Sequence, residues 1–130
     1  PRGCPFKIPA PLLPTPSPLH DTEWALLKTH TIIGESMLGQ IGGLLGEVGA
    51  IVRHCHERWD GRGYPDGLSD ETIPLESRII FVCDAYHAMT TDRPYRKKLS
   101  HPEAVRRLRE GVGSQFDGDV VDVALRVIEA

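Results

Sequence analysis

The segment His54-Cys-His-Glu-Arg-Trp-Asp-Gly-Arg-Gly-Tyr-Pro65 gathers reactive side chains in a short stretch of this 130-residue chain. Two imidazoles, a thiol and a carboxylate fall within four residues, and two glycines and a proline follow. The pattern predicts that residues 54–57 form the last turn of an amphipathic helix and that residues 60–67 form the loop leaving it. The apolar residues that support this helix recur at the spacing of one face: Leu44, Leu45, Val48, Ile51, Val52 and Cys55.

The composition is that of an ordinary globular domain, with 40% hydrophobic and 25% charged residues. The net charge of −3 gives no reason to propose a nucleic acid or an anionic membrane as a partner. The three cysteines include no Cys-x-x-Cys pair, which argues against a disulfide framework. Because no apolar run reaches membrane-spanning length and no signal peptide is visible, we expect a cytoplasmic protein.

The chain divides into two parts of different composition. Residues 1–19 hold seven of the eleven prolines, a density that excludes helix and regular strand and predicts an extended arm. Residues 20–130 carry helical patterns throughout. The predicted helices run from Asp21 to about residue 38, over about 47–57, over roughly 75–90, from the capping-box segment beginning at Ser100 to near Gly111, and onward from Asp117.

One of these assignments has an alternative. The segment Arg78-Ile-Ile-Phe-Val82 has the propensity of a buried strand, but the apolar character continues through Met89, which is long for a strand. We therefore predict a helix there and an all-α bundle for the domain.

Several potential metal ligands lie on different predicted helices. His30 belongs to the first, the cluster of Cys55 and His56 ends the second, and Asp84 interrupts an apolar run in the third. A buried carboxylate requires a cation or a hydrogen-bonding partner. Mixed histidine and carboxylate ligands suit iron, manganese or zinc rather than calcium or magnesium.

Each of these residues also has a purely structural interpretation. A lone histidine such as His30 is more often a surface or capped residue than a ligand, and Cys55 falls on the apolar stripe of its helix. Asp84 has Arg78 or Arg93 within reach as a structural partner, and the glycines after Asp60 suit a tight turn. The clustering, rather than any single residue, favours a metal site.

A basic segment, Asp92-Arg-Pro-Tyr-Arg-Lys-Lys98, follows the third predicted helix. Arginine side chains bind phosphate oxygens through two parallel hydrogen bonds, so Arg93 and Arg96 are candidates for a phosphate clamp. A solvated basic turn explains the same residues equally well.

Taken in order, these motifs resemble the HD-GYP family. The core of the resemblance is His56-Glu-Arg-Trp-Asp-Gly-Arg-Gly-Tyr-Pro-Asp-Gly-Leu68. It is supported by Lys28-Thr-His-x-x-x-Gly34, Val82-x-Asp84, Asp92-Arg-Pro-Tyr-Arg96 and Gly113-x-Gln-Phe-Asp117. The resemblance runs from about Leu19 to the end of the chain and assigns residues 20–130 to the C-terminal part of such a domain.

The resemblance implies an HD-type helical bundle and a role in bacterial signalling. The family hydrolyses the phosphodiester bonds of cyclic di-GMP to pGpG or GMP with two or three iron or manganese ions. Carried over by position, His30, Cys55, His56 and Asp84 match metal ligands, with Cys55 in the place of a histidine. Arg93 and Arg96 match substrate-phosphate contacts. The loop associated with the shape of the substrate site contains Gly61, Gly63, Tyr64 and Pro65.

The chain also departs from the family pattern. Aligned without gaps, Pro1 and Arg2 stand where the His-Asp dipeptide belongs, and Pro5 stands where the family has lysine. Thiolate is softer than imidazole, so Cys55 shifts the metal preference toward zinc. We therefore expect weak or no hydrolysis by this chain alone. The alternative is a module that binds cyclic di-GMP or a diguanylate cyclase domain without catalysis. Apolar helix faces left uncovered by the absent family helices predict self-association into a homo-oligomer.

Overall fold

The computed structural model describes residues 21–94 and 96–129, and the predicted Pro-rich arm lies outside these ranges. The helices are α1 (Asp21–Ile41), α2 (Leu44–Arg53), α3 (Leu75–Thr90), α4 (His101–Glu110) and α5 (Gly118–Ile128), with a 3-10 turn, η2 (Asp70–Thr72). The predicted all-α class is confirmed. In the ranges described, no helix has both the length and the apolar character needed to cross a bilayer.

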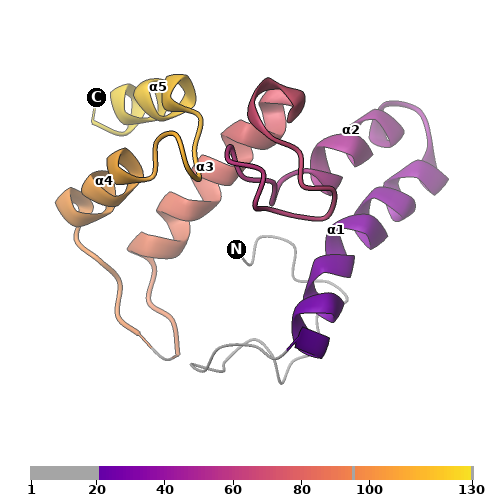
Figure 1. The fold of residues 1–130 in the computed structure, drawn as a ribbon, viewed down its shortest axis with the longest axis horizontal. Coiled ribbons are helices and arrows are strands. Elements are labelled where there is room, and N and C mark those ends of the chain that lie inside the picture. Colours follow the sequence, from indigo (N-terminus) through magenta and orange to yellow (C-terminus); the bar gives the residue numbers. More distant parts are fainter. Residues whose placement is uncertain (1–20, 95, 130) are drawn as a thin grey trace.

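The helices form two groups joined by a long loop (Figure 1). Helices α1 and α2 form an antiparallel hairpin on one side, and α4 and α5 pack on α3 on the other. The loop between α2 and α3 folds back between the two groups. The loop therefore lies beside both helical groups.

Local sequence signals account for several of the helix ends. Helix α3 has the predicted bounds, Leu75–Thr90. At the start of α4, the Ser100 hydroxyl accepts a hydrogen bond from the Glu103 backbone N–H at 3.3 Å. At the start of α5, the Asp117 carboxylate accepts one from Asp119 N–H at 2.9 Å. These side chains satisfy backbone donors that have no partner within the helix.

The ends of the first two helices differ from the prediction. Helix α1 continues through Gly39, and the chain turns at Gly42 and Gly43, which adopt positive φ angles of 80° and 62°. Helix α2 ends at Arg53, so the prediction that residues 54–57 form its last turn is wrong. These residues form a tight turn instead, in which Cys55 N–H bonds to the Val52 carbonyl and Glu57 N–H to the His54 carbonyl.

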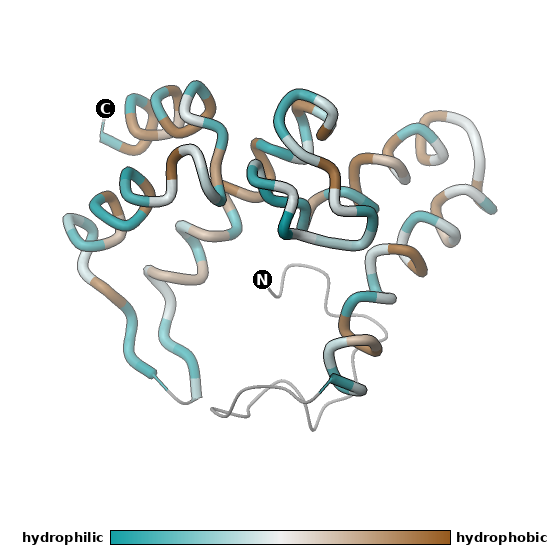
Figure 2. The backbone as a smooth tube through the Cα atoms, in the orientation of Figure 1, coloured by the Kyte–Doolittle hydropathy of each residue, from teal (hydrophilic) through white to brown (hydrophobic). Residues whose placement is uncertain are grey.

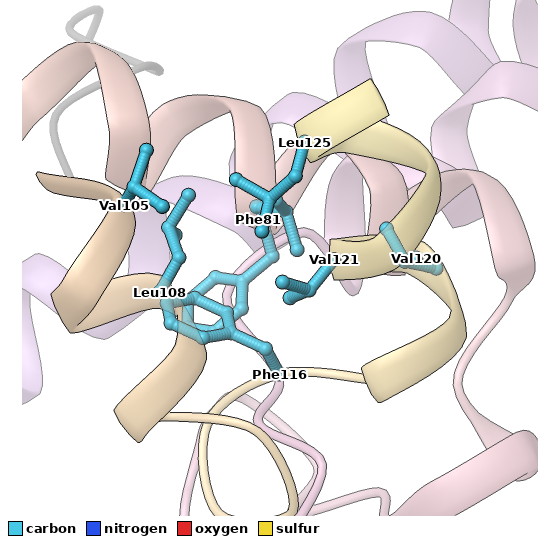
Figure 3. Close-up of a cluster of buried hydrophobic side chains, with 8 residues drawn as sticks. Phe81, Val105, Leu108, Phe116, Val120, Val121 and Leu125 are labelled. Atoms are coloured by element: carbon cyan, nitrogen blue, oxygen red, sulfur yellow. The ribbon is translucent and has the colours of Figure 1, made fainter. Parts of the chain in front are cut away.

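The hydrophobic core lies among α3, α4 and α5. Figure 3 shows its side chains pointing toward one another, with Phe81 and Phe116 in ring contact at 5.5 Å between centroids. An ion pair of 2.6 Å between Arg78 and Asp117 ties the start of α5 to α3. The cluster consists of Phe81, Val82, Val105, Leu108, Phe116, Val120, Val121 and Leu125.

The α1–α2 hairpin is packed differently. Its buried residues are His30, Thr31, Gly34 and Gly49. Gly49 lets α2 approach α1 closely, because a Cβ there would lie 3.2 Å from the Glu35 carbonyl oxygen. Hydrophobic residues recur along both helices (Figure 2), but several of them are exposed to solvent. Leu44, for example, is 73% exposed.

Candidate functional site

The loop after α2 is fixed by close backbone contacts. A Cβ on Gly63 would lie 2.4 Å from the Arg58 nitrogen and 2.5 Å from the His56 carbonyl oxygen, so only glycine fits there. The next residue, Tyr64, donates its backbone N–H to the His56 carbonyl at 3.2 Å. The loop thus folds back over residues 56–58 and brings the Tyr64 side chain to His56.

Glu57 fastens the far side of the same loop. Its side chain is fully buried, and its two carboxylate oxygens accept the backbone N–H groups of Asp66 at 2.9 Å and Leu68 at 3.0 Å. A buried carboxylate is stabilised by such charge-assisted hydrogen bonds. Glu57, at the start of the loop, therefore binds the backbone of the later loop residues Asp66 and Leu68.

Further hydrogen bonds connect the loop to the α4–α5 connection. Trp59 N–H donates to the Gln115 carbonyl at 3.1 Å, and Asp60 N–H donates to the Ser114 carbonyl at 2.8 Å. These contacts place the loop on the body formed by α3, α4 and α5.

Two of the predicted metal ligands come together beneath the loop. His30 from α1 is 1% exposed and His56 is 2% exposed, and their ring centroids lie 4.9 Å apart. Tyr64 is stacked on His56 at 5.2 Å. Helix α1 and the turn after α2 therefore bring two imidazoles into one buried cluster.

Hydrogen bonding sets the tautomer of His30. Its Nδ1 contacts the Leu27 carbonyl oxygen, which only accepts hydrogen bonds. Nδ1 therefore carries the proton, and Nε2 carries the lone pair that a metal ion requires.

The other two predicted metal ligands have different surroundings. Cys55 is 2% exposed. Asp84 is half-buried on α3 and lines a cavity of about 310 Å³. Phe81 and Gln115 belong to the walls of this cavity and of a larger one that His56 lines. Asp84 thus lines a cavity that adjoins the one lined by His56.

The larger cavity has a volume of about 730 Å³. Beside His56 and Tyr64, its wall includes three cationic side chains, Lys28, Arg58 and Arg62. The Arg58 guanidinium bonds to Asp60 at 2.8 Å and holds the pKa of that carboxyl below its usual range. Neither Lys28 nor Arg62 forms a salt bridge within the described ranges, although the charge of Arg62 also helps to lower the pKa of Asp60.

The predicted phosphate clamp lies elsewhere on the chain. Arg93 and Arg96 pair through their backbones, and the Arg96 guanidinium donates to the Ala88 carbonyl at 2.7 Å. Neither arginine is among the lining residues of the 730 Å³ cavity. Their contact with substrate stays a prediction.

A second group with metal-ligand chemistry lies on the outer side of the loop. His54 Nδ1 is 3.3 Å from a Glu57 oxygen and 3.4 Å from an Asp66 oxygen. Asp66 is already bonded to Arg53 through both oxygens, at 2.8 and 2.9 Å, which lowers the pKa of its carboxyl. Glu57 holds the loop backbone. These partners explain the group as a structural ion-pair network.

The comparison with known families covers most of the chain. Residues 5–120 match the family model described as HD domain. The chain belongs to the HD domain family. The predicted resemblance is thereby confirmed.

Relatives of this HD domain carry related names. A cyclic di-GMP phosphodiesterase of Pseudomonas aeruginosa is 40% identical over 123 residues, which cover 95% of this chain and 30% of the relative. A cyclic di-GMP phosphodiesterase response regulator of Xanthomonas campestris is 40% identical over 123 residues, 93% of this chain and 32% of the relative. The chain thus spans about a third of the length of these relatives.

A solved structure supports the fold of this HD domain. A cyclic GMP-AMP-specific phosphodiesterase of Vibrio cholerae superposes with a TM-score of 0.69 at 22% identity. The match covers 85% of this chain and 25% of that protein. At this identity the likeness bears on the fold alone.

Four residues that line the HD domain's large cavity are not indicated as site residues by the sequence patterns: Trp24, Lys28, Arg58 and Arg62. Arg58 and Arg62 lie inside the segment His56–Leu68 that carries the family resemblance, which assigns no role to either arginine. Trp24 lies in the first predicted helix, and Lys28 begins the motif Lys28-Thr-His-x-x-x-Gly34. Counting along the helix face of His30 does not reach Trp24 or Lys28, because neither lies three, four or seven positions from that histidine.

Proposed function

We propose that this HD domain binds a cyclic dinucleotide, with cyclic di-GMP as first candidate, and belongs to a metal-dependent phosphodiesterase. The observation that carries the proposal is the buried pair of His30 and His56, of which His56 lines a cavity with cationic side chains in its wall. The relatives named as cyclic di-GMP phosphodiesterases support the choice of ligand.

The types of side chain present suit a divalent metal ion. His30 offers Nε2 within the buried imidazole pair, and Asp84 faces the adjoining cavity. Imidazole and carboxylate ligands suit iron, manganese or zinc, and participation of Cys55 would favour zinc. When bound, such an ion lowers the pKa of a water molecule and neutralises phosphate charge.

The remaining residues of the site hold the ligand. Lys28, Arg58 and Arg62 place positive charge around the cavity, where they neutralise phosphate oxygens. The loop with Gly61, Gly63, Tyr64 and Pro65 shapes the wall beside His56, since Gly63 and Tyr64 both line the cavity. Arg93 and Arg96 supply further phosphate contacts in this proposal.

We further propose that this chain alone hydrolyses its ligand slowly or not at all. Pro1 and Arg2 occupy the aligned position of the His-Asp dipeptide, and neither side chain replaces a metal-bridging carboxylate. The same observation favours the second candidate function, in which the domain binds cyclic di-GMP, or a diguanylate cyclase domain, without turnover.

Titration calorimetry and product chromatography with manganese and cyclic di-GMP test these proposals. We expect metal-dependent binding that His56→Ala removes and that the solvent-exposed control His101→Ala retains. We also expect little pGpG or GMP. Turnover that His56→Ala abolishes would overturn the proposed inactivity of the chain, and absence of binding by the unaltered chain would overturn the proposed function.

A further inference from the structure

One face of α1 lines the large cavity. Asp21, Trp24, Ala25 and Lys28 all belong to its wall, and their positions i, i+3, i+4 and i+7 are those of a single helix face. In the described structure this face meets the cavity rather than the hydrophobic core of α3, α4 and α5.

Trp24 is an unusual residue for such a wall. Its side chain is large and apolar but 42% exposed, and its ring meets Tyr64 edge to face, with 6.5 Å between centroids and 70° between planes. Ala25 beside it adds little bulk. An exposed indole edge-on to a second aromatic ring, at the side of a cavity, offers a flat surface on which a nucleobase stacks.

Polar groups flank the indole on both sides. Asp21 lies about one turn before Trp24 and offers only acceptor atoms, while Lys28 lies about one turn after it and offers only donors. The Watson–Crick edge of guanine presents two neighbouring donors, N1–H and N2–H, and a carboxylate can accept both. An adenine edge presents one donor and one acceptor, which a carboxylate does not match.

We propose that Asp21, Trp24 and Lys28 form a guanine-nucleotide subsite. Trp24 stacks on the base, Asp21 accepts hydrogen bonds from its Watson–Crick edge, and Lys28 binds a phosphate. This inference rests on the proposed function and adds to it a base preference and the residues responsible.

The test measures binding of GMP, AMP, cyclic di-GMP and cyclic di-AMP to the full chain by calorimetry. Trp24→Ala and Trp24→Phe probe stacking, and Asp21→Asn probes base selection. Trp59→Phe is the matched control, because Trp59 is the chain's other tryptophan and does not line the cavity. Glu47→Gln on α2 is the control for loss of an acidic group. Circular dichroism checks that each variant is folded.

We expect Trp24→Ala to weaken binding of GMP and cyclic di-GMP by about fivefold to 150-fold, with Trp24→Phe retaining part of the affinity. Asp21→Asn should reduce the preference for GMP over AMP. Ligand should also quench the fluorescence of Trp59→Phe, in which Trp24 is the reporter.

Two results separate this inference from the proposed function. Tight binding of cyclic di-GMP with the same affinity in Trp24→Ala and the unaltered chain would overturn the subsite and leave the proposed function standing. Binding of GMP that depends on Trp24, without binding of either cyclic dinucleotide, would support the subsite and overturn the proposed function. Absence of binding by all four nucleotides would overturn both.

Discussion

The two helical groups of this domain differ in the residues packed inside each of them. Helices α3, α4 and α5 enclose a cluster of apolar side chains, whereas the α1–α2 hairpin buries two polar residues and two glycines. The hairpin leaves large apolar side chains exposed in the described structure, including Ile41 at 69% and Leu44 at 73%. The core group thus has an apolar cluster of its own, whereas the fully buried residues of the hairpin are polar or glycine.

The candidate site lies where these two groups meet. His30 comes from α1, His56 from the turn after α2, and Asp84 from α3. The loop is tied to the core group by backbone bonds and to the end of α2 by Glu57. The core group and the loop thus provide one wall of the site, and the hairpin brings His30 and Trp24 to it. The predicted self-association of the exposed apolar faces stays a prediction.

The sharpest contrast between the groups is expected from matched leucine truncations. Leu108→Ala removes a fully buried side chain from the core and should lower the free energy of unfolding by about 2–5 kcal/mol. The control is Leu26→Ala in α1, where the leucine is 45% exposed. This substitution should change the free energy of unfolding by less than about 0.5 kcal/mol. Urea denaturation measures both, and equal losses would mean that the hairpin has a core of its own.

A pair of glycine substitutions separates the loop from the hairpin. Gly63→Ala forces a Cβ against backbone atoms at 2.4 to 2.6 Å and should cost about 2–3 kcal/mol of unfolding free energy. Gly39→Ala places a Cβ on α1 with nothing within 4 Å and should stabilise the chain by about 0.5–1 kcal/mol. Thermal unfolding compares them. A harmless Gly63→Ala would show that the loop does not lie against residues 56–58.

Glu57→Gln tests whether the carboxylate fastens the loop. Glutamine keeps one acceptor oxygen and replaces the other with a donor that faces a backbone N–H. The loss of one hydrogen bond should lower the free energy of unfolding by about 1–2 kcal/mol. Hydrogen exchange should show faster exchange of the Asp66 or Leu68 amide, with the amides of α4 unaffected as internal control. Unchanged protection of both loop amides would contradict the assignment.

Low pH should weaken the ion pair between Arg53 and Asp66, and its effect on stability should be smaller than those of the substitutions above. Hydrogen bonds from Arg53 hold the folded pKa of Asp66 below its unfolded value of about 3.9. The stabilisation is therefore fully present above that unfolded value and is lost as the pH falls through the folded pKa. An exposed pair contributes under about 1 kcal/mol. Arg53→Gln should reduce the loss of unfolding free energy at acidic pH. The same loss in the variant and the unaltered chain would contradict stabilisation by the Arg53–Asp66 pair.

Much of the fold could be predicted because its signals are local. Ser100 and Asp117 cap helices as their residue types suggest, and the bounds of α3 follow from a sustained apolar run after Pro74. The end of α2 could not be predicted in the same way. Apolar periodicity continues to Cys55, but the chain leaves the helix after Arg53, where contacts between Glu57 and loop amides nine and eleven residues later take over.

The site was predicted only in part for the same reason. The residue types and the family resemblance predict that His30 and His56 share one site. The cavity wall formed by Trp24, Lys28 and Arg62 depends on how α1 lies against the loop, which a periodicity argument does not specify.

Metal content tests the central claim most directly. Elemental analysis of protein purified without chelators should find iron, manganese or zinc in the unaltered chain. His56→Ala and Asp84→Ala should lose this metal, while His54→Ala, in the neighbouring ion-pair network, should retain it. Metal that persists in His56→Ala but disappears in His54→Ala would place the ion at His54, Glu57 and Asp66, and would contradict the assignment of the buried histidine pair as the metal centre.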